Sequence, residues 1–409
     1  MSRNPAFLTW IDLTASDRDK VRRVLDLFNE QGTVDELGLG PIRDFLSDAL
    51  FPGTSVLHTR LRYVLFIPWI HRRLEERAHR VKDVVAEARA LELQLVEALK
   101  SSGDQEGIIG AYAGSTLARL PSQAYWAGLV RWGIFVPHQS QSWYFRHFWD
   151  LVRRGSAHQP EDPGSIAGPE PTWNPHLPDP PEDLLESATF ALSAEEAEFV
   201  RGCIEANVPH SLLAWLAREG SPELHAAPWP WEIPGVNWMP DHLSELLELA
   251  RRFSLHVEGA PLLYNLLLAE ARRDRYGDPQ GQEEAGIEKY RRALTQWAEQ
   301  EAEEAEPFET GALWGAAARY GAPIKEPLKR FVESWSEGVA AAGAHGVAES
   351  RRLRELVAQR ERALKGGRAR LVNESRLLDW RGDTGVGRLN FRWPQVRREL
   401  TDLHEGLAR

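Results

Sequence analysis

The densest group of polar side chains lies in the stretch DELGLGPIRDFLSDALFPGTSVLHTRLRY, residues 35–63. It combines carboxylates, arginines and a histidine with strongly apolar neighbours. A carboxylate acts as a base or stabilises developing positive charge, and guanidinium groups bind phosphate through paired hydrogen bonds. The pattern therefore indicates a pocket for a phosphate-bearing substrate. The candidate residues are Asp44, Asp35, Glu36, Arg43, His58, Thr59, Arg60, Arg62 and Tyr63.

A structural interpretation of the same residues stays open. Arginines beside an apolar core need carboxylate partners, because breaking a buried ion pair costs roughly 3–5 kcal/mol. Ion pairs Asp44–Arg60 or Asp35–Arg62 would meet that need. The sequence alone does not separate such pairs from a site.

Two smaller groups are further candidates. Ser140 and Tyr144 lie in the segment SQSWY, where a hydroxyl and an aromatic ring are able to line the same cleft, and Trp126 precedes them. Tyr264 and Asn265 stand on an otherwise apolar helical pattern, APLLYNLLLAE. They indicate either a polar cavity or a buried pair whose hydrogen bonds are satisfied.

Several catalytic signatures are absent from the sequence. It contains no GxxxxGK[ST] phosphate loop, no HExxH and no GxSxG, which argues against P-loop nucleotide hydrolysis, zinc hydrolysis and triad hydrolysis. Cys203 is the only cysteine, so we expect no disulfide framework and no cysteine-rich metal site. We therefore predict no metal and no cofactor.

Charge is unevenly distributed along the chain. The formal net charge is −11, yet residues 351–409 carry fifteen basic and eight acidic side chains. Residues 283–309 carry nine acidic and three basic ones. The basic tail is either a solvated helical surface or a face that meets a polyanion. On the second interpretation, Arg397 and Arg398 bind DNA.

The elements that would position these residues are mostly helices. Helical spacing of apolar residues predicts helices over 15–31, 41–50, 61–76 and 79–100 in the N-terminal part. Residues 107–138 read as helix, turn, helix and short strand, the layout of a winged helix-turn-helix. That unit is either a DNA reader or a purely structural pair of helices.

The rest of the chain begins with a proline-rich segment. Residues 160–181 contain eight prolines and are predicted to be a linker or surface loop. This divides the chain into an N-terminal domain at 1–159 and a C-terminal domain at 182–409. Beyond 193, we expect helices ending in a β-hairpin over 377–393 with a glycine-rich tip, then a final helix. The predicted fold class is mainly α, with a small winged-helix-like unit and a C-terminal β-hairpin.

Other features bear on location. The N-terminus reaches charged residues too soon for a secretory signal. The longest apolar run, residues 64–70, is far shorter than the ~20 residues that span a membrane. We therefore expect a cytoplasmic protein that does not bind a membrane.

Four stretches together resemble one bacterial family. They are the segment from residue 35 to LFIPWIHRRLE, then QAYWAGLVRWGIF, APLLYNLLLAE and RLNFRWPQVRREL. The family is catalogued as a domain of unknown function, and its members occur beside restriction, methylation and helicase genes in phage-defence loci. It is also similar to phage-defence DNA glycosylases that remove glucosylated hydroxymethylcytosine.

The resemblance implies an antiphage protein that excises a modified cytosine and leaves an abasic site. A carboxylate beside C1′ would stabilise the positive charge on the sugar, with Asp44 the first choice and Asp35 or Glu36 behind it. Arg43, Arg60 and Arg62 would hold phosphates or sugar hydroxyls. Tyr63, Trp126 or Tyr144 would stack on the extruded base. The alternative is a non-enzymatic defence component that binds DNA or a protein partner.

Overall fold

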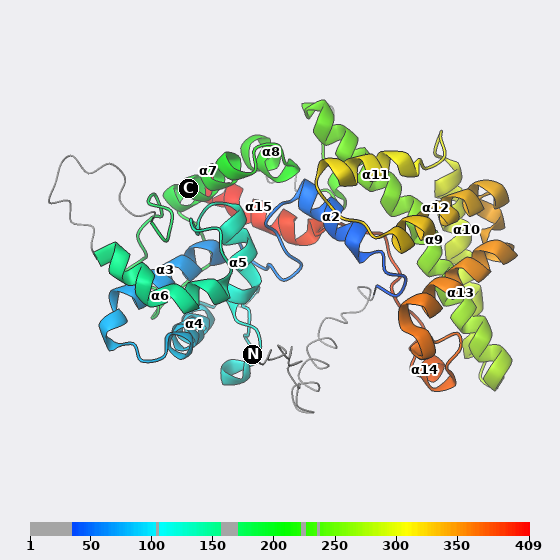
Figure 1. Ribbon diagram of the computed structural model, residues 1–409, viewed down its shortest axis with the longest axis horizontal. Helices are drawn as coiled ribbons and strands as arrows, with labels where there is room; N and C mark the ends of the chain where they lie inside the picture. Colours follow the sequence, from blue (N-terminus) through cyan, green and yellow to red (C-terminus); the bar gives the residue numbers. More distant parts are fainter. Residues whose placement is uncertain (1–34, 104–105, 157–170, 222–225, 235–237) are drawn as a thin grey trace, which may run out of the picture. The chain divides into compact units, whose positions relative to one another are not determined.

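The computed structural model describes residues 35–103, 106–156, 171–221, 226–234 and 238–409. Across these residues the chain is mainly helical and forms no strand, so the helical part of the predicted fold class is confirmed (Figure 1). The helix predicted over 15–31 lies outside the described residues. The other helices predicted in the N-terminal part overlap observed ones, except over 107–117, where the structure has no α-helix.

The chain divides into two compact units, each assembled from separate stretches of sequence. Unit 1 comprises Met1–Ile42 and Arg252–Leu389, and unit 2 comprises Arg43–Arg251 and Asn390–Arg409. Two of the divisions fall inside the helices α2 (Gly40–Leu50) and α9 (Asp241–Tyr276). Residues on both sides of the predicted linker therefore belong to unit 2.

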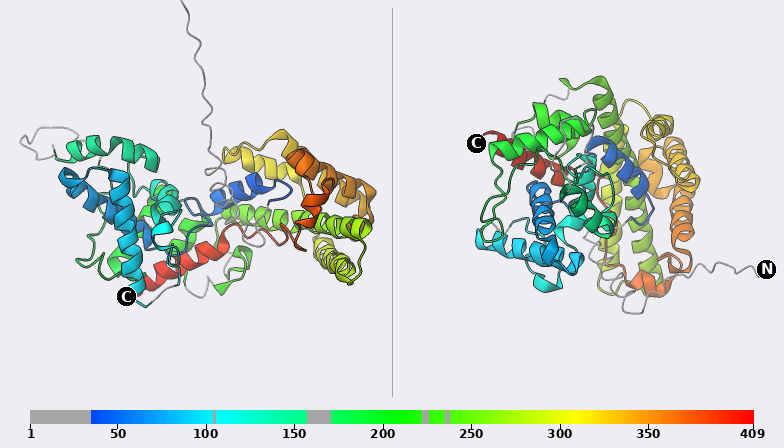
Figure 2. Two further views of the ribbon diagram at one scale, coloured as in Figure 1. Left: turned by 90° about the horizontal axis from the view of Figure 1, so that it is seen from below. Right: turned by 60° about the vertical axis from the view of Figure 1, so that its left-hand side comes forward.

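Unit 2 is built around the apolar helix α3 (Tyr63–Glu76), of which ten residues are buried. This helix packs on α4 and α5, while α15 packs against α7 and α8, as Figure 2 shows for the green and red helices. Burial on nearly every face explains why α3 continues through Pro68, which alone would break a helix. The other helices are α4 (Val84–Ser101), α5 (Pro121–Arg131), α6 (Gln141–Ser156), α7 (Ala194–Asn207), α8 (Leu212–Glu219) and α15 (Trp393–Leu407).

Unit 1 is organised on the long helix α9, most of which lies in this unit. The helix is continuous and includes Pro261, whereas the apolar pattern predicts two helices, over 241–254 and 258–275. Helix α12 packs on α11 and α13, and α10 packs on the short helix η6 (Ala344–Glu349). The bounds are α10 (Gln282–Ala302), α11 (Thr310–Arg319), α12 (Glu326–Ala342), α13 (Arg351–Lys365) and α14 (Glu374–Leu378).

The prediction of a winged helix is wrong. Only its second helix, α5, forms. Before it, Gly107, Gly110 and Gly114 adopt positive φ angles of 89°, 87° and 48°, which interrupt any helix. The expected strand is reduced to a single antiparallel bridge between Phe135 and Trp173. The segment after it, for which no element was predicted, forms α6 (Gln141–Ser156).

The predicted C-terminal hairpin is also wrong. The residues with which it would begin, 377 and 378, end the helix α14, which is capped by Asn373 as its side chain accepts a hydrogen bond from the Arg376 N–H. Its second half cannot extend, since Phe391 and Arg392 take φ angles of 51° and 68°. Among residues 374–393 the structure has no strand.

The proline-rich segment is described only from residue 171 onward. Residues 171–181 contain no helix and no strand, in agreement with the predicted loop. Residues 160–170 lie outside the described residues. Within the described residues, no helix is both long and apolar enough to cross a membrane.

Candidate functional site

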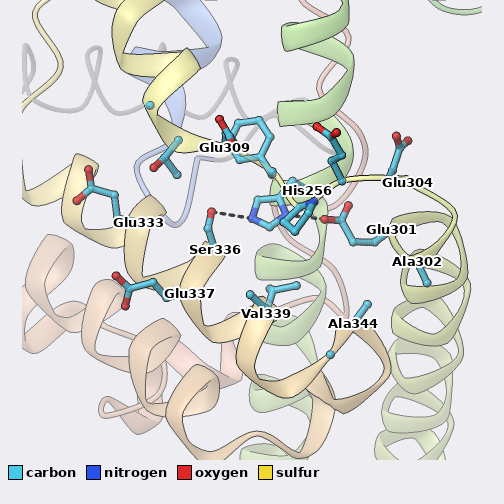
Figure 3. A pocket seen from close by; sticks show the side chains of 17 residues that line it. His256, Glu301, Ala302, Glu304, Glu309, Glu333, Ser336, Glu337, Val339 and Ala344 are labelled. Carbon is cyan, nitrogen blue, oxygen red and sulfur yellow. Dashed lines mark hydrogen bonds and ion pairs between the residues drawn. The ribbon is translucent and has the colours of Figure 1, made fainter.

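Unit 1 contains a pocket of about 760 Å³. Its wall comes from α9, the end of α10, the connection into α11, one face of α12 and the start of η6. Three of the side chains that line it, His256, Glu301 and Ser336, are joined by hydrogen bonds (Figure 3). These three residues are the strongest candidate for a reaction centre.

The imidazole of His256 lies between a carboxylate and a hydroxyl. Its Nδ1 is 2.6 Å from Oε1 of Glu301, and its Nε2 is 2.8 Å from Oγ of Ser336. With Nδ1 donating to the carboxylate, Nε2 is free to accept the Ser336 proton. A nucleophile, a base and a group that orients the base are therefore within hydrogen-bond reach in that order.

The position of His256 is fixed by large aromatic residues. Its ring stacks on Phe308 with centroids 4.9 Å apart and planes inclined by 19°. Trp335 donates its indole N–H to the His256 carbonyl at 3.0 Å, and Trp297 donates to the Leu255 carbonyl at 2.8 Å. Gly259 allows the Trp297 ring to approach, because a Cβ there would lie 2.6 Å from it. The imidazole is thus held by packing on both sides of its helix.

Glu301 occupies an electrostatically costly position. It stands in the last turn of α10, where the helix dipole disfavours a negative charge. Compensation comes from His256 and from Arg252, whose Nη1 lies 3.8 Å from Oε2 of Glu301 and 3.4 Å from Glu304. The helix dipole and burial both disfavour a carboxylate at this position. Its hydrogen bond to His256 explains why a glutamate stands here.

The first turn of α11 supplies a further element of the pocket. Thr310 and Gly311 line it, and Glu309 at the N-cap makes no side-chain capping bond. The first N–H groups of a helix lack partners inside the helix and favour negative charge. They are therefore suited to stabilise an oxyanion that forms in the pocket. Among the described residues, no cluster of histidine, cysteine or carboxylate side chains is arranged to hold a metal.

A family model covers residues 5–406, which is nearly the whole chain. The chain belongs to DUF6361. This is a family of unknown function, so membership assigns no activity. No curated protein and no solved structure matches the chain. The link to phage-defence DNA glycosylases stays a prediction for this DUF6361 member.

No sequence pattern marks His256, Glu301 or Ser336 as functional residues. Glu301 lies 45 residues and Ser336 lies 80 residues from the histidine. No local motif marks the serine, which sits within a helix rather than on a GxSxG turn. Such a constellation is recognised by geometry and not by order in the chain. Only the folding of α9, α10 and α12 brings the three together.

The arginines predicted as substrate ligands are occupied by other partners. Arg60 pairs with Asp402 at 3.0 Å, and Arg62 pairs with Glu196 at 2.6 Å. Asp44, the first-choice carboxylate, pairs with its neighbour Arg43 at 2.9 Å and its side chain is 52% exposed. The ion pair expected between Asp44 and Arg60 does not form, because each of them pairs with a different residue.

Asp35 and Glu36 lie in unit 1. Asp35 accepts hydrogen bonds from the N–H groups of Leu39 and Gly40, both at 2.6 Å, and so secures the start of α2. Because these bonds occupy both of its oxygens, Asp35 has a structural role. It does not pair with Arg62.

Glu36 belongs to a buried polar cluster that also includes Tyr264, another of the predicted site residues. It contacts the side chains of Lys365 and Arg370, and the Thr384 hydroxyl donates to it at 2.7 Å. Tyr264 donates to Glu361 at 2.5 Å, and Glu361 also lies 3.4 Å from Lys365. Burial and Arg370 lower the pKa of Lys365 to about 7.

Asn265 is fully satisfied rather than open to a cavity. Its amide donates to the carbonyls of Pro261 and Thr384, and its oxygen accepts from the indole of Trp380. The structural interpretation of this residue is therefore confirmed. It ties the middle of α9 to the segment that follows α14.

The remaining candidates near residue 60 hold unit 2 together. His58 is buried between Glu399 at 2.8 Å and the Ala124 carbonyl at 3.3 Å. The Thr59 hydroxyl donates to the Gly107 carbonyl, and the buried Tyr63 hydroxyl accepts from the Ile109 N–H. These bonds fix the loops around residue 60 to the rest of unit 2.

The aromatic candidates surround a buried histidine. Rings of Trp126 and Tyr144 lie 5.5 and 5.1 Å from that of His71, whose Nδ1 bonds to the Ile67 carbonyl. Burial lowers the pKa of His71 to about 4 and raises the pKa of Glu75, the acceptor of the Tyr144 hydroxyl, to about 7. These rings are core residues.

The last candidates lie at or near helix surfaces. Ser140 accepts from the Trp143 N–H in the first turn of α6. Arg397 donates to the Ala227 carbonyl at 3.3 Å, and Arg398 pairs with Glu106 at 2.7 Å. Each is thus engaged within unit 2.

Proposed function

We propose that the chain is a serine hydrolase whose nucleophile is Ser336. One observation carries the proposal: the hydrogen-bonded series Glu301–His256–Ser336 lies in the wall of a pocket. A pocket of about 760 Å³ falls within the roughly 300–1,000 Å³ typical of small-molecule sites. The substrate class is a small ester, thioester or amide.

Each group has a defined role in this reaction. His256 Nε2 accepts the proton of Ser336 as Oγ attacks the carbonyl carbon, and the carbonyl oxygen becomes an oxyanion near the first N–H groups of α11. The leaving group departs with the proton from His256, which forms an acyl-serine. Water, deprotonated by His256, then releases the acid and restores Ser336. Glu301 holds the Nδ1–H tautomer throughout.

The proposal is tested with a biotinylated fluorophosphonate, which reacts with activated serines. We expect a single adduct on the peptide that contains Ser336. The substitution Ser336→Ala should abolish it, and His256→Ala should slow it by about two orders of magnitude or more, the low end for loss of a base.

Ser334→Ala is the matched control, since Ser334 lies on the same helix but does not line the pocket. It should label at the wild-type rate. Circular dichroism and thermal melting show whether each variant is folded. Equal labelling of folded Ser336→Ala and wild type would refute the assignment.

Excision of a modified cytosine from phage DNA is a second proposal. It is favoured by the amine of Lys365, 23% exposed, beside the carboxylate of Glu36. A desolvated lysine next to another cation is a suitable nucleophile for a sugar carbon. Displacement of the base would leave an iminium link, which water hydrolyses to an abasic sugar.

Glucosylated and plain phage DNA distinguish this activity. Abasic sites and a borohydride-trapped adduct on Lys365 should form only with the modified DNA, and Glu36→Gln should reduce both. Asp44→Asn tests the first-choice carboxylate in the same assay. Absence of abasic sites with folded wild-type protein would rule the activity out for this substrate.

A further inference from the structure

The pocket around Ser336 is lined by an unusual excess of one charge. Six glutamates face it, and none of its lining residues is lysine or arginine. Three of the six lie within ion-pair distance of arginines from outside the lining: Glu301 and Glu304 near Arg252, and Glu337 near Arg352. Another, Glu333, accepts from the neutral indole of Trp314 and forms no ion pair with the described residues. Negative charge therefore remains uncompensated.

Two of these glutamates provide most of that remaining charge. The side chains of Glu306 and Glu309 are exposed and make no ion pair with the described residues. Glu309 stands at the N-cap of α11, beside the N–H groups assigned to the oxyanion. Both are therefore available to a ligand that enters the pocket from solvent.

A buried oxygen inside the pocket points the same way. The Glu301 side chain is only 8% exposed, and its Oε2 has no hydrogen-bond donor among the described residues. Arg252 approaches it no closer than 3.8 Å. A buried acceptor without a donor is costly, so this oxygen adds to the negative potential that a cationic ligand meets in the pocket.

The pocket also has an apolar part. Pro307, Phe308, Val339 and Ala340 contribute to its lining. They suit the methyl or methylene groups of an organic cation, whose positive charge is attracted both to carboxylates and to an aromatic ring. Inorganic phosphate or a nucleic-acid backbone would instead meet repulsion from the glutamates.

We infer that the substrate of the Ser336 centre carries an organic cation, such as a quaternary or primary ammonium group, on its acyl or leaving group. The inference rests on the proposed hydrolase function, because the same pocket serves both. Glu306 and Glu309 are its specificity-determining residues. They hold the cationic group and take no part in proton transfer.

A matched pair of small molecules tests the charge preference. Choline and its neutral isostere 3,3-dimethylbutan-1-ol have the same shape and differ in charge. Each is used to protect Ser336 from the fluorophosphonate, at constant ionic strength set by sodium chloride. We expect choline to slow labelling at a concentration roughly tenfold lower than the alcohol, with a preference that shrinks as salt rises.

The double substitution Glu306→Gln and Glu309→Gln should bring the two protecting concentrations to within about twofold while Ser336 still labels. Glu303→Gln is the control, because Glu303 is an exposed neighbour that does not line the pocket. The Glu303→Gln variant should still be protected by choline at a lower concentration than by the alcohol.

The outcomes separate the two claims. Labelling of Ser336 without protection by choline, or with equal protection by both compounds, overturns the cation preference and leaves the hydrolase standing. No labelling of Ser336 in folded protein overturns both.

Discussion

At the scale of single residues, the fate of a polar group depends on whether its bonds are complete. His58 has both nitrogens engaged and is buried, so it stabilises unit 2 and is not available to a substrate. His256 has the same number of bonds, but one of them is to a hydroxyl in a pocket wall. The difference lies in the partner, since a serine hydroxyl gives its proton to a base and a peptide carbonyl does not.

The carboxylate that orients His256 is testable at this scale. In Glu301→Gln the amide can donate to Nδ1 and so favours the tautomer with its proton on Nε2, which cannot accept from Ser336. We expect fluorophosphonate labelling of Ser336 to slow by about two to four orders of magnitude with little change in melting temperature. Glu303→Gln is the control, because Glu303 is two residues further along the chain, at the C-cap of α10. It should leave the labelling rate unchanged. A Glu301→Gln protein that labels at the wild-type rate would show that Glu301 is not part of the centre.

At the scale of helices, sequence patterns predicted the elements correctly where local capping signals and burial of the apolar face agree. Ser193 and Glu196 form the capping box that starts α7, and Ser211 caps α8. The patterns failed where tertiary contacts decide. The apolar pattern predicts two helices, over 241–254 and 258–275, but the chain is buried along this stretch and α9 continues without a break. The first helix of the predicted winged unit does not form because Gly107, Gly110 and Gly114 have positive φ angles, and the hairpin does not form because Phe391 and Arg392 also have positive φ angles.

One helix contact makes stability depend on pH. Glu92 of α4 is buried and accepts from the N–H and hydroxyl of Ser122 in the first turn of α5, at 2.8 and 2.7 Å. Burial raises its pKa from 4.5 to about 7. Because the folded state binds this proton more tightly than the unfolded state, its contribution is complete below pH 4.5 and is lost as pH rises through 7.

We therefore expect the free energy of unfolding to fall between pH 5 and 8, with Glu92 contributing up to about 3 kcal/mol of the decrease. Glu75 should add to the fall, since burial also raises its pKa to about 7. His71 acts in the opposite direction, but mainly below pH 6.5, because burial lowers its pKa to about 4. Urea unfolding at pH 5 and 8 measures the change.

The substitution Glu92→Gln isolates the effect, as glutamine keeps an acceptor for Ser122 and cannot ionise. Its stability should fall less between the two pH values than that of the wild type. Glu97→Gln on the same helix is the control, because Glu97 is exposed and pairs with Lys100. If Glu92→Gln and wild type show the same pH dependence, the buried carboxylate is not its source.

At the scale of the whole chain, the charge pattern read from sequence changes meaning once the partners are known. The basic tail does not present a free positive surface. Most of its arginines form ion pairs within their own unit, among them Arg352–Glu337, Arg354–Glu270, Arg370–Glu36, Arg388–Glu258, Arg392–Asp48 and Arg398–Glu106. The acidic stretch 283–309 instead supplies Glu301, Glu304, Glu306 and Glu309 to the pocket. Composition located both charge excesses, but only the fold shows which one stays uncompensated.

This distribution makes binding to plain DNA unfavourable. With a net charge of −11 and most of the tail arginines in ion pairs, few cations remain to release counterions from a duplex. We expect the fluorescence anisotropy of a labelled plain duplex to stay unchanged at protein concentrations up to about 100 µM and physiological salt. The affinity would then be weaker than the roughly 10⁻⁴–10⁻⁶ M usual for non-specific binders. The double substitution Arg397→Glu and Arg398→Glu should leave the anisotropy of the duplex unchanged. Glu106→Gln, which removes the carboxylate paired with Arg398, should at most allow weak binding. Tight binding that weakens steeply with salt, and that the Arg397 and Arg398 substitutions reduce alike on every sequence, would contradict this expectation and favour a DNA-acting function over the hydrolase.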